Sequence, residues 1–519
     1  MLLKFVAALL LGVVWGTVAQ SQINLQALAE LGVPIAMDTR LQVTLHDLWN
    51  FGPVYAVLYG GSFVASQAVA LLLTRFVGMP WRTALCTLGA ALGLWVTFKV
   101  VDMIAPMPTL IAATRGVGGT LSMLAGAALA GYLFSKGTAT PRQGALSTRT
   151  SMLAMAVLVS GATLLPAEPA FAQAKTAYTV NTFVDGLQNP WGMAFLPDGR
   201  ALVTEKQGRL RVVEANCKLN PQPLKGMPSV HFGGQAGLFD VLPAKDFEQS
   251  KRLYISYACG TRQANHLCVS SAVLGNGELL QVKEIFRSHM AKSGNAHYGG
   301  RMDWLPDNTL IVTLGDGYDY REEAQNLNNH LGKIVRINAD GSVPANNPFS
   351  GKQGARPEIY SLGHRNVQGL VYDSVGKRLL AHEHGARGGD EINVIEPGKN
   401  YGWPKATYGV DYSGAQISPF KTFDGTEQPA IYWVPSIAPS GMAVYNGELF
   451  PAWKGDVLVG ALRAQQVSRV TVTGNKGVEK EVLFKEVGER IRDVRVGPDG
   501  AVYLLTDNSD GRVLRVTPK

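Results

Sequence analysis

The chain carries two kinds of hydrophobic pattern. Up to about residue 136, long apolar runs alternate with short polar loops; the runs cover residues 2–18, 54–76, 84–104 and 117–134. Because about 20 apolar residues cross the hydrocarbon core of a bilayer, the pattern predicts a membrane region at 1–136 with about four transmembrane helices. From residue 177 onward, short Val/Ile/Leu/Tyr runs alternate with Gly, Asp, Asn and Pro clusters, which is typical of an all-β structure.

One strand–turn–strand unit recurs in residues 177–519. It consists of a small residue, an apolar alternation, a Pro-Asp-Gly-like turn and a second apolar run. Clear copies lie at 191–204, 299–312 and 492–505, and looser copies begin near Gln235, Asn366 and Ser440. Six copies over this length predict a six-bladed β-propeller at 177–519. A β-sandwich array is the structural alternative.

Residues 137–176 form a basic linker with a fifth apolar run at 152–165, and a small-x-small sequence ends at Ala172. This run is either a cleaved secretory signal or a last membrane segment. With a cytoplasmic N-terminus, most basic loop residues fall on the inner side. These are Lys4, Arg75, Arg82, Lys136, Arg142 and Arg149, against Arg40 and Arg115 outside. Both alternatives predict a periplasmic propeller, membrane-anchored unless the chain is cleaved near Ala172.

Charge and cysteine content narrow the function classes. The net charge is +8, and residues 1–150 hold nine basic and four acidic residues, so most of it flanks the apolar runs. A nucleic-acid partner is therefore not expected, since that function needs clustered cations on a folded surface. Cys259 and Cys268 flank a short polar loop between two strand-like runs, a spacing that a hairpin disulfide could bridge in an oxidising compartment.

Polar clusters lie directly before the predicted blade starts. They occupy residues 295–301, 363–369, 382–393 and 489–493. Together they supply an imidazole at His297, several guanidinium groups and a Gly-rich acidic loop. This set suits binding of a multiply charged anion and transfer of a proton or hydride. Arg490 and Arg492 alternate on one predicted strand, so both should point to the same face.

In the order and spacing of these motifs, residues 177–519 resemble the soluble aldose sugar dehydrogenases of the glucose/sorbosone dehydrogenase family. The resemblance implies pyrroloquinoline quinone (PQQ) and Ca²⁺ as cofactors, and oxidation of aldoses at C1 to lactones by hydride transfer to PQQ. It assigns His297 as the catalytic base and Arg365 to the charge that develops on the reduced quinone. The residues that match cofactor contacts are Gln235, Arg365, Asn366, Tyr412, Arg463, Arg490 and Arg492.

The resemblance also implies two calcium sites. The backbone carbonyls of Gly385 and Ala386 match ligands of an ion bound to the quinone. Glu391 and the Tyr401 carbonyl match a second, structural ion. The neighbouring Asp390 has no assigned role. Further residues expected near the sugar or the cofactor are Gln368, Trp403, His364, His382 and His384.

Three positions depart from the family pattern. Arg463 stands where the family usually has Lys. Ala296 stands where some glucose-oxidising members have an Asp that holds the histidine ring, and Ala386 replaces a common Pro. The change at Ala296 favours the broad aldose branch over strict glucose specificity.

Two other functions remain open from the sequence: a calcium-dependent propeller lactonase and a non-catalytic sugar-binding propeller. The fold alone does not choose among them. An imidazole beside several cations favours the dehydrogenase, since hydrolysis has no use for cations around a planar tricarboxylate. The expected partners are an aldose, an electron acceptor such as a quinone or cytochrome, and the membrane through residues 1–136. A homodimer is a further option.

Overall fold

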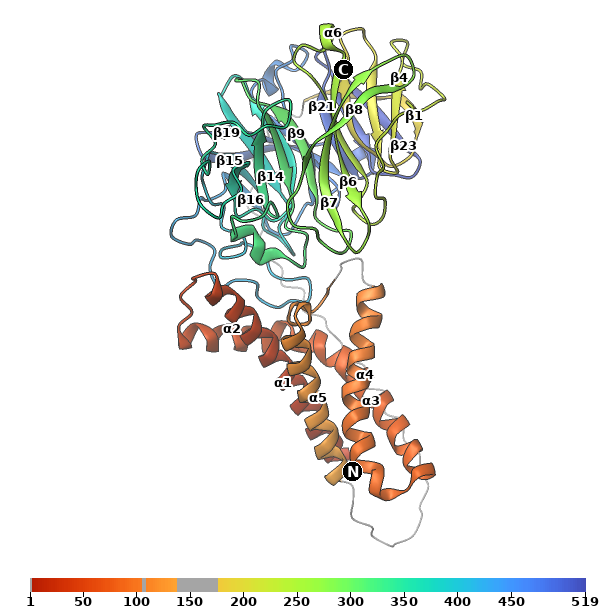
Figure 1. The fold of residues 1–519 in the computed structure, drawn as a ribbon, viewed down its shortest axis with the longest axis vertical. Helices are drawn as coiled ribbons and strands as arrows, with labels where there is room; N and C mark the ends of the chain where they lie inside the picture. Colours follow the sequence, from red (N-terminus) through yellow and green to blue (C-terminus); the bar gives the residue numbers. More distant parts are fainter. Residues whose placement is uncertain (1, 105–108, 138–175) are drawn as a thin grey trace.

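A computed structural model describes residues 2–104, 109–137 and 176–519. The first two stretches form the helical region. Its helices are α1 (Leu2–Glu30), α2 (Met37–Asn50), α3 (Gly52–Val77), α4 (Arg82–Ile104) and α5 (Val117–Gly137), with 3₁₀ turns η1 (Met79–Trp81) and η2 (Ala112–Arg115). In these stretches α1, α3, α4 with η1, and α5 are long and apolar enough to cross a membrane. The shorter α2 lies across the bundle at its propeller end (Figure 1).

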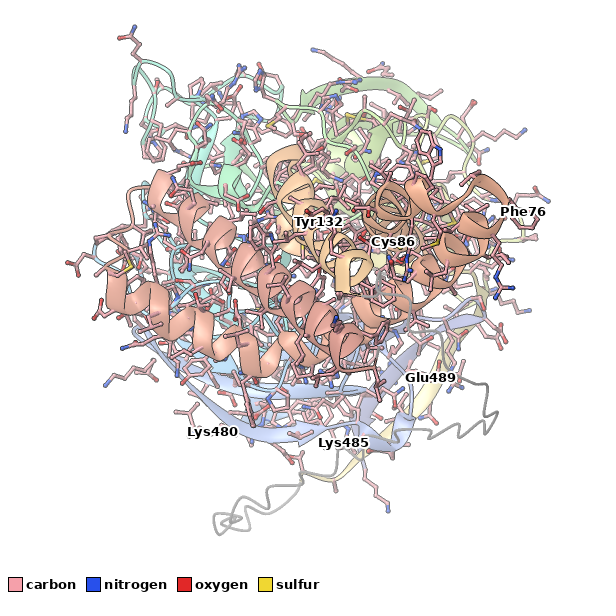
Figure 2. All side chains as sticks on the ribbon, turned by 90° about the horizontal axis from the view of Figure 1, so that it is seen from below. Phe76, Cys86, Tyr132, Lys480, Lys485 and Glu489 are labelled. Atoms are coloured by element: carbon pink, nitrogen blue, oxygen red, sulfur yellow. A yellow bond between two sulfur atoms is a disulfide. The ribbon has the colours of Figure 1, made fainter. Side chains whose placement is uncertain are left out.

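The helical region turns many large apolar side chains outward and packs an aromatic cluster together with small residues inside. Phe76 and Leu88 are 80% and 68% exposed, as suits helices that face lipid. At Gly131 of α5, a Cβ would lie 2.3 Å from the carbonyl oxygen of Cys86 on α4. Only glycine permits this approach of the two backbones, which is the usual way that membrane helices pack. Figure 2 views this bundle from below, with Phe76, Cys86 and Tyr132 labelled, and shows it lying over the propeller.

Residues 176–519 form β-sheets. The strands are β1 (Tyr178–Leu187), β2 (Pro190–Phe195), β3 (Ala201–Glu205), β4 (Arg209–Val213), β5 (Leu238–Pro243), β6 (Arg252–Gly260), β7 (Asn265–Leu274), β8 (Leu279–Arg287), β9 (Gly299–Trp304), β10 (Leu310–Leu314), β11 (Lys333–Ile337), β12 (Ile359–Leu362), β13 (Val367–Asp373), β14 (Arg378–Glu383), β15 (Asp390–Ile395), β16 (Ile431–Trp433), β17 (Pro439–Val444), β18 (Val457–Ala461), β19 (Gln466–Thr473), β20 (Lys476–Leu483), β21 (Ile491–Val496), β22 (Val502–Thr506) and β23 (Gly511–Pro518). Short helical pieces are α6 (Phe247–Ser250), η3 (Arg321–Gln325), η4 (Pro451–Trp453) and η5 (Lys485–Val487).

Within residues 176–519 these strands make six sheets, one of three strands (β2–β4) and five of four. The first strands of successive blades (β2, β5, β9, β13, β17 and β21) contact one another in turn, and β21 contacts β2. The sheets therefore close into a ring, which confirms the predicted six-bladed propeller. The last blade borrows β1 from the start of the domain, which pairs antiparallel with β23 from Tyr178↔Pro518 to Leu187↔Gly511.

The blades are held together by apolar contacts. Trp453 is fully buried and stacks on Phe450 with ring centres 4.0 Å apart. Both belong to a cluster that continues into the next blade at Val502 and Leu504. Cys259 on β6 and Cys268 on β7 form a disulfide, at the hairpin where the sequence spacing allowed one.

One face of the propeller gathers the segments that precede the first strands of the blades. Because these strands run in the same direction around the axis, their starts meet at one end of the ring. The helical region docks on this end: Asn24 of α1 donates hydrogen bonds to the carbonyl oxygens of Gln416 and Ile417. The start of α1, the turn between α3 and α4, and the end of α5 lie at the opposite end of the bundle, away from the propeller in Figure 1. These helix ends contain Lys4, Arg75, Arg82 and Lys136.

Candidate active site

His297 lies on the covered face, directly before β9. Its side chain is 2% exposed, and its Nδ1 is 2.7 Å from Oδ1 of Asp316. The backbone N–H of His297 donates to Oε1 of Gln235 at 2.8 Å. Its φ of 51° is a left-handed conformation that costs energy for a residue with a Cβ, so the surrounding bonds hold the ring in place.

The electrostatics of this pair favour a neutral ring beside a charged carboxylate. Burial, together with the nearby Arg365 cation, lowers the pKa of His297 to about 4, although Asp316 opposes the shift. Burial opposes ionisation of Asp316, but His297 and Arg365 keep the pKa of that carboxyl below its usual value. A neutral imidazole that donates Nδ1–H to Asp316 presents Nε2 as a proton acceptor.

Asp316 is the main functional residue that sequence reasoning missed. Its Oδ2 accepts a hydrogen bond from Trp403 Nε1 at 2.8 Å, and its Oδ1 accepts one from the Tyr318 backbone. A Cβ on the preceding Gly315 would lie 2.5 Å from the His297 carbonyl oxygen, so glycine allows the two segments to touch. The carboxylate that is missing at Ala296 is thus supplied by the loop that follows β10. The only signal in the sequence was the Gly-Asp-Gly at residues 315–317, where a long loop begins.

Arg365 and Asn366 directly precede β13, as the motif predicted. Arg365 is buried; it donates from one terminal nitrogen to the carbonyl oxygens of His384, at 3.2 Å, and of Gly385. Its guanidinium carbon is 5.4 Å from the centre of the Trp403 ring. Asn366 Oδ1 accepts hydrogen bonds from the Gly299 backbone and from Gln368, each at 3.2 Å. The blade starts therefore converge on one point.

A cavity of about 410 Å³ opens at this point. Residues of three kinds line it: aromatic (Trp191, Phe239, Tyr298, Tyr412), cationic (Lys206, Arg490, Arg492) and polar (Gln235, Asn366, Gln368, His384). Five of the predicted cofactor contacts, Gln235, Asn366, Tyr412, Arg490 and Arg492, are thus brought together. Arg463 is exposed, and among the described residues the lining includes its neighbour Leu462 in its place.

The cavity carries excess positive charge. Arg490 Nε bonds Asp507 Oδ2 at 2.9 Å, and Arg492 bonds Oδ1 of the same carboxylate at 2.9 and 3.0 Å. The two guanidinium groups therefore point the same way, as their alternation predicted. Lys206 lies close by, and burial, followed by the charge of Arg492, lowers its pKa. Three cations against one carboxylate suit an anionic ligand.

A second, much smaller cavity of about 20 Å³ lies on the other side of Tyr412, which lines both. From the propeller it is lined by His297, Arg365, Ala386 and Trp403, and from the helical region by Thr109, Ala112 and Arg115. Trp403 is thus placed beside the histidine, on the side of Asp316. Nothing in the sequence pattern indicated that residues from the helical region would reach this site.

The acidic loop after β14 is organised by Asp390. Its Oδ1 accepts the Gly385 N–H at 2.8 Å, and its Oδ2 accepts Ser436 Oγ and the backbone N–H groups of Ile437 and Ala438. With both oxygens bonded, Asp390 holds two loops together. A Ca²⁺ ion at this loop would share the Gly385 carbonyl with Arg365, so the fit there requires the guanidinium to move.

Glu391 lies in a better cation site. It is close to Glu383, and Asn393 Nδ2 donates to Glu391 at 3.1 Å and to Glu383 at 3.4 Å. Burial, and next the charge of Glu383, raise the pKa of Glu391 well above its usual value. Asn393 Oδ1 is buried and has no hydrogen-bond partner among the described residues. Two carboxylates and an unpaired amide oxygen are the ligands that calcium prefers.

The remaining predicted residues lie around this framework. His364 bonds Glu383 Oε1 at 2.9 Å and stacks on the Tyr401 ring at 4.8 Å. This places Tyr401 beside the Glu383 cluster. His384 lines the large cavity and its Nε2 lies 2.6 Å from the Pro439 carbonyl oxygen. His382 is buried against Gly369, away from both linings.

Known proteins resemble this chain over the propeller. Residues 187–515 match the family model described as Glucose / Sorbosone dehydrogenase. Aldose sugar dehydrogenase YliI of Escherichia coli (strain K12) is 42% identical over 353 residues, which cover 66% of this chain and 94% of that protein. The crystal structure of the soluble aldose sugar dehydrogenase (Asd) from Escherichia coli in the apo-form aligns with a TM-score of 0.64 and 40% identity, over 66% of this chain and 100% of that one.

A PQQ-bound structure is also similar. The PQQ-bound form of aldose sugar dehydrogenase (Adh) from Streptomyces coelicolor aligns with a TM-score of 0.55 and 29% identity, over 67% of this chain and 99% of that chain. The family model does not extend over the helical region. Because that model matches more than half of the chain and the relatives align along almost their whole length, the chain belongs to the glucose/sorbosone dehydrogenase family.

Proposed function

We propose that this chain oxidises aldose sugars at C1 to lactones, with PQQ as hydride acceptor and His297 as general base. The observation that carries the proposal is the buried His297–Asp316 pair beside Arg365. His297 and Arg365 line the small cavity, and Tyr412 lines both this cavity and the larger, cation-lined one. The PQQ-bound structural neighbour and the relative named quinoprotein glucose dehydrogenase B, from Acinetobacter calcoaceticus, support the choice of cofactor. When bound, PQQ supplies the electrophilic quinone that takes the hydride from C1.

The chain itself handles the proton. As C1 loses a hydride and its hydroxyl loses a proton, the anomeric carbon becomes the carbonyl of a lactone. His297 Nε2 takes that proton, which a neutral, buried imidazole can do at neutral pH. Asp316 stabilises the imidazolium that forms, and Trp403 holds Asp316 through its second oxygen.

The cavity residues fit a planar anion with several carboxylates. Arg490, Arg492 and Lys206 offer more positive charge than Asp507 neutralises, and guanidinium groups bind carboxylates through paired hydrogen bonds. Gln235, Asn366 and Arg365 approach from the histidine side, where we place the quinone oxygens. Tyr412 lines the same cavity. Contact with Arg463 would require its exposed side chain to reach past Leu462.

We assign Ca²⁺ to two places. Glu391 with Glu383 and Asn393 would hold a structural ion, and we assign the Tyr401 carbonyl as a further ligand, as the family resemblance implies. The carbonyls of Gly385 and Ala386 would hold an ion at the cofactor once Arg365 turns toward the quinone. Such an ion acts as a Lewis acid on a bound carbonyl.

We place the propeller in the periplasm, anchored by the helical region. The basic residues Lys4, Arg75, Arg82 and Lys136 lie at the end of the bundle away from the propeller, which the positive-inside rule assigns to the cytoplasm. The Cys259–Cys268 disulfide fits an oxidising compartment. The 152–165 segment and the cleavage position near Ala172 lie outside the described residues. A quinone or cytochrome would serve as electron acceptor.

The test is reconstitution of the full chain in detergent. The protein is titrated with PQQ and Ca²⁺, and reduction of a dye is followed with a panel of aldoses. The proposal predicts saturable PQQ binding and sugar-dependent reduction that needs PQQ. Lactone hydrolysis without PQQ would favour the lactonase, and sugar binding without turnover would favour a binding propeller.

A further inference from the structure

The helical region covers the face of the propeller that carries His297. The small cavity beside the histidine is walled on one side by Thr109, Ala112 and Arg115, which precede α5. At about 20 Å³ it holds roughly one water molecule. Ala112 is 8% exposed, so it is part of the packed wall. The space beside the catalytic ring is therefore closed on the side of the helices.

Arg115 fixes this wall to the loop that carries Asp316. Its two terminal nitrogens bond both carboxylate oxygens of Glu322, at 2.9 and 3.0 Å, and one of them also donates to the Asp319 carbonyl oxygen at 3.3 Å. Its Nε donates to the Ala112 carbonyl oxygen. One guanidinium thus ties the helical wall to residues 319–322. In the same loop, the Tyr318 hydroxyl donates to the Thr109 carbonyl oxygen at 3.3 Å, and its ring packs edge-on against His297.

A second set of contacts fixes the loop that carries Tyr412. Asn24 of α1 donates to the carbonyl oxygens of Gln416 and Ile417, at 2.8 Å each, and accepts a bond from Arg321. Asp47 of α2, fully buried, accepts the Gln416 N–H at 2.8 Å. Both loops that enclose the small cavity are therefore held by polar side chains of the helical region.

Apolar contacts complete the docking. Leu25 and Leu28 of α1 and Val43 of α2 are buried, and Phe420 and Phe423 of the propeller pack against them. The interface therefore combines ion pairs and hydrogen bonds with an apolar patch. Any other packing that buried these polar groups without the same partners would cost free energy, so the contacts favour this one orientation.

We infer that residues 109–115 form one wall of the sugar site and restrict the enzyme to short sugars. The inference rests on the proposed function. The small cavity is the space that His297 shares with this wall, and it holds about one water molecule. A sugar that presents C1 to His297 must therefore widen this space against the wall, and a second sugar unit on that side would collide with Ala112. Arg115 is a positioning residue here: it holds the wall and the loop of Tyr318 in contact without touching the reacting atoms.

The first test compares sugars of different length. In Arg115→Ala the wall loosens, so the ratio of kcat/KM for a disaccharide (maltose) to that for glucose should rise about tenfold. Hydrogen exchange of residues 318–322 should speed up in the same variant, whether or not PQQ is bound. Arg40→Ala is the matched control, because the Arg40 side chain bonds Gln22 within the helical region. It should change neither readout.

The second test fills the wall. Ala112→Leu adds three carbons next to a cavity of about 20 Å³, so KM for glucose should rise about tenfold or more while the PQQ titration stays unchanged. If the wild type oxidises glucose but neither variant changes the sugar ratio or KM, the wall is refuted and the proposed function stands. If the wild type binds no PQQ and oxidises no aldose, the proposed function fails, and the sugar wall with it.

Discussion

The propeller and the helical region are built in opposite ways. The propeller buries its large apolar side chains between blades, as at Trp453, and gathers charged groups around its axis. The helical region exposes apolar side chains such as Phe76 and buries polar ones such as Asn24 and Asp47. In lipid, polar groups must be satisfied inside the protein. Asn24 meets this need through carbonyl oxygens of the propeller. Asp47 accepts one bond from Ser21 of α1 and one from the Gln416 N–H. Docking therefore completes the hydrogen bonding of the helical region.

The largest expected effect is on turnover, because the proposed function assigns the chemistry to the propeller. His297→Ala should lower kcat about 10²–10⁴-fold, the usual contribution of a general base, with PQQ affinity retained. Dye reduction and PQQ titration measure the two effects. The exposed His289 provides the control as His289→Ala. Turnover retained in His297→Ala would remove this residue from the mechanism.

The next prediction compares a buried aromatic residue of the propeller with an exposed one of the helical region. Trp453→Ala should destabilise the propeller by about 3–5 kcal/mol, because it empties a fully buried site. Phe76→Ala, at a position 80% exposed on α3, should change the stability in detergent far less. Denaturant unfolding of the full chain measures both. Equal losses of unfolding free energy in the two variants would contradict this difference between the propeller and the helical region.

The pH dependence of stability tests whether the His297 ring near the propeller axis is neutral. The pKa of His297 is lowered from 6.5 to about 4, so the unfolded chain binds the proton more tightly than the folded one. The stability due to the neutral ring is complete above pH 6.5 and is lost as the pH falls toward 4, by about 3 kcal/mol. The unfolding free energy of the wild type and of His297→Ala, compared between pH 7 and 4, should show that the variant loses less. Parallel curves would contradict the assigned shift.

The smallest effect concerns charge pairs outside the interface. Arg200 and Asp198 pair at 2.7 Å on side chains that are 35% and 49% exposed. Arg200→Ala should therefore change stability by less than about 1 kcal/mol, and less still at high salt. Arg115 and Glu322, at the interface, are 14% and 29% exposed. Arg115→Ala should therefore lower the free energy of unfolding more than Arg200→Ala does. A larger loss of stability in Arg200→Ala than in Arg115→Ala would show that burial does not decide which ion pair stabilises the protein more.

The sequence predicted features that are encoded locally. The turn motifs and apolar alternation identified the blades, and the clusters before the strands identified His297, Arg365 and the Arg490–Arg492 pair. Asp316 was missed because its link to His297 crosses a whole hairpin of β9 and β10, and nothing local marks it. Arg115 was interpreted only as a loop charge beside a membrane segment. Its place at the cavity depends on how two regions dock, which neither pattern contains.

Closure of the ring by β1 and β23 has a consequence for biosynthesis. The strand at residues 178–187 must wait for residues 511–518, which the ribosome adds only after all the other strands of the propeller. The helices α1 to α5 are made before the propeller, so they emerge before the surface on which they dock exists. Loss of residues 511–519 would remove the partner that β1 and β22 share, and would leave the helices without a finished face to receive Asn24 and Arg115.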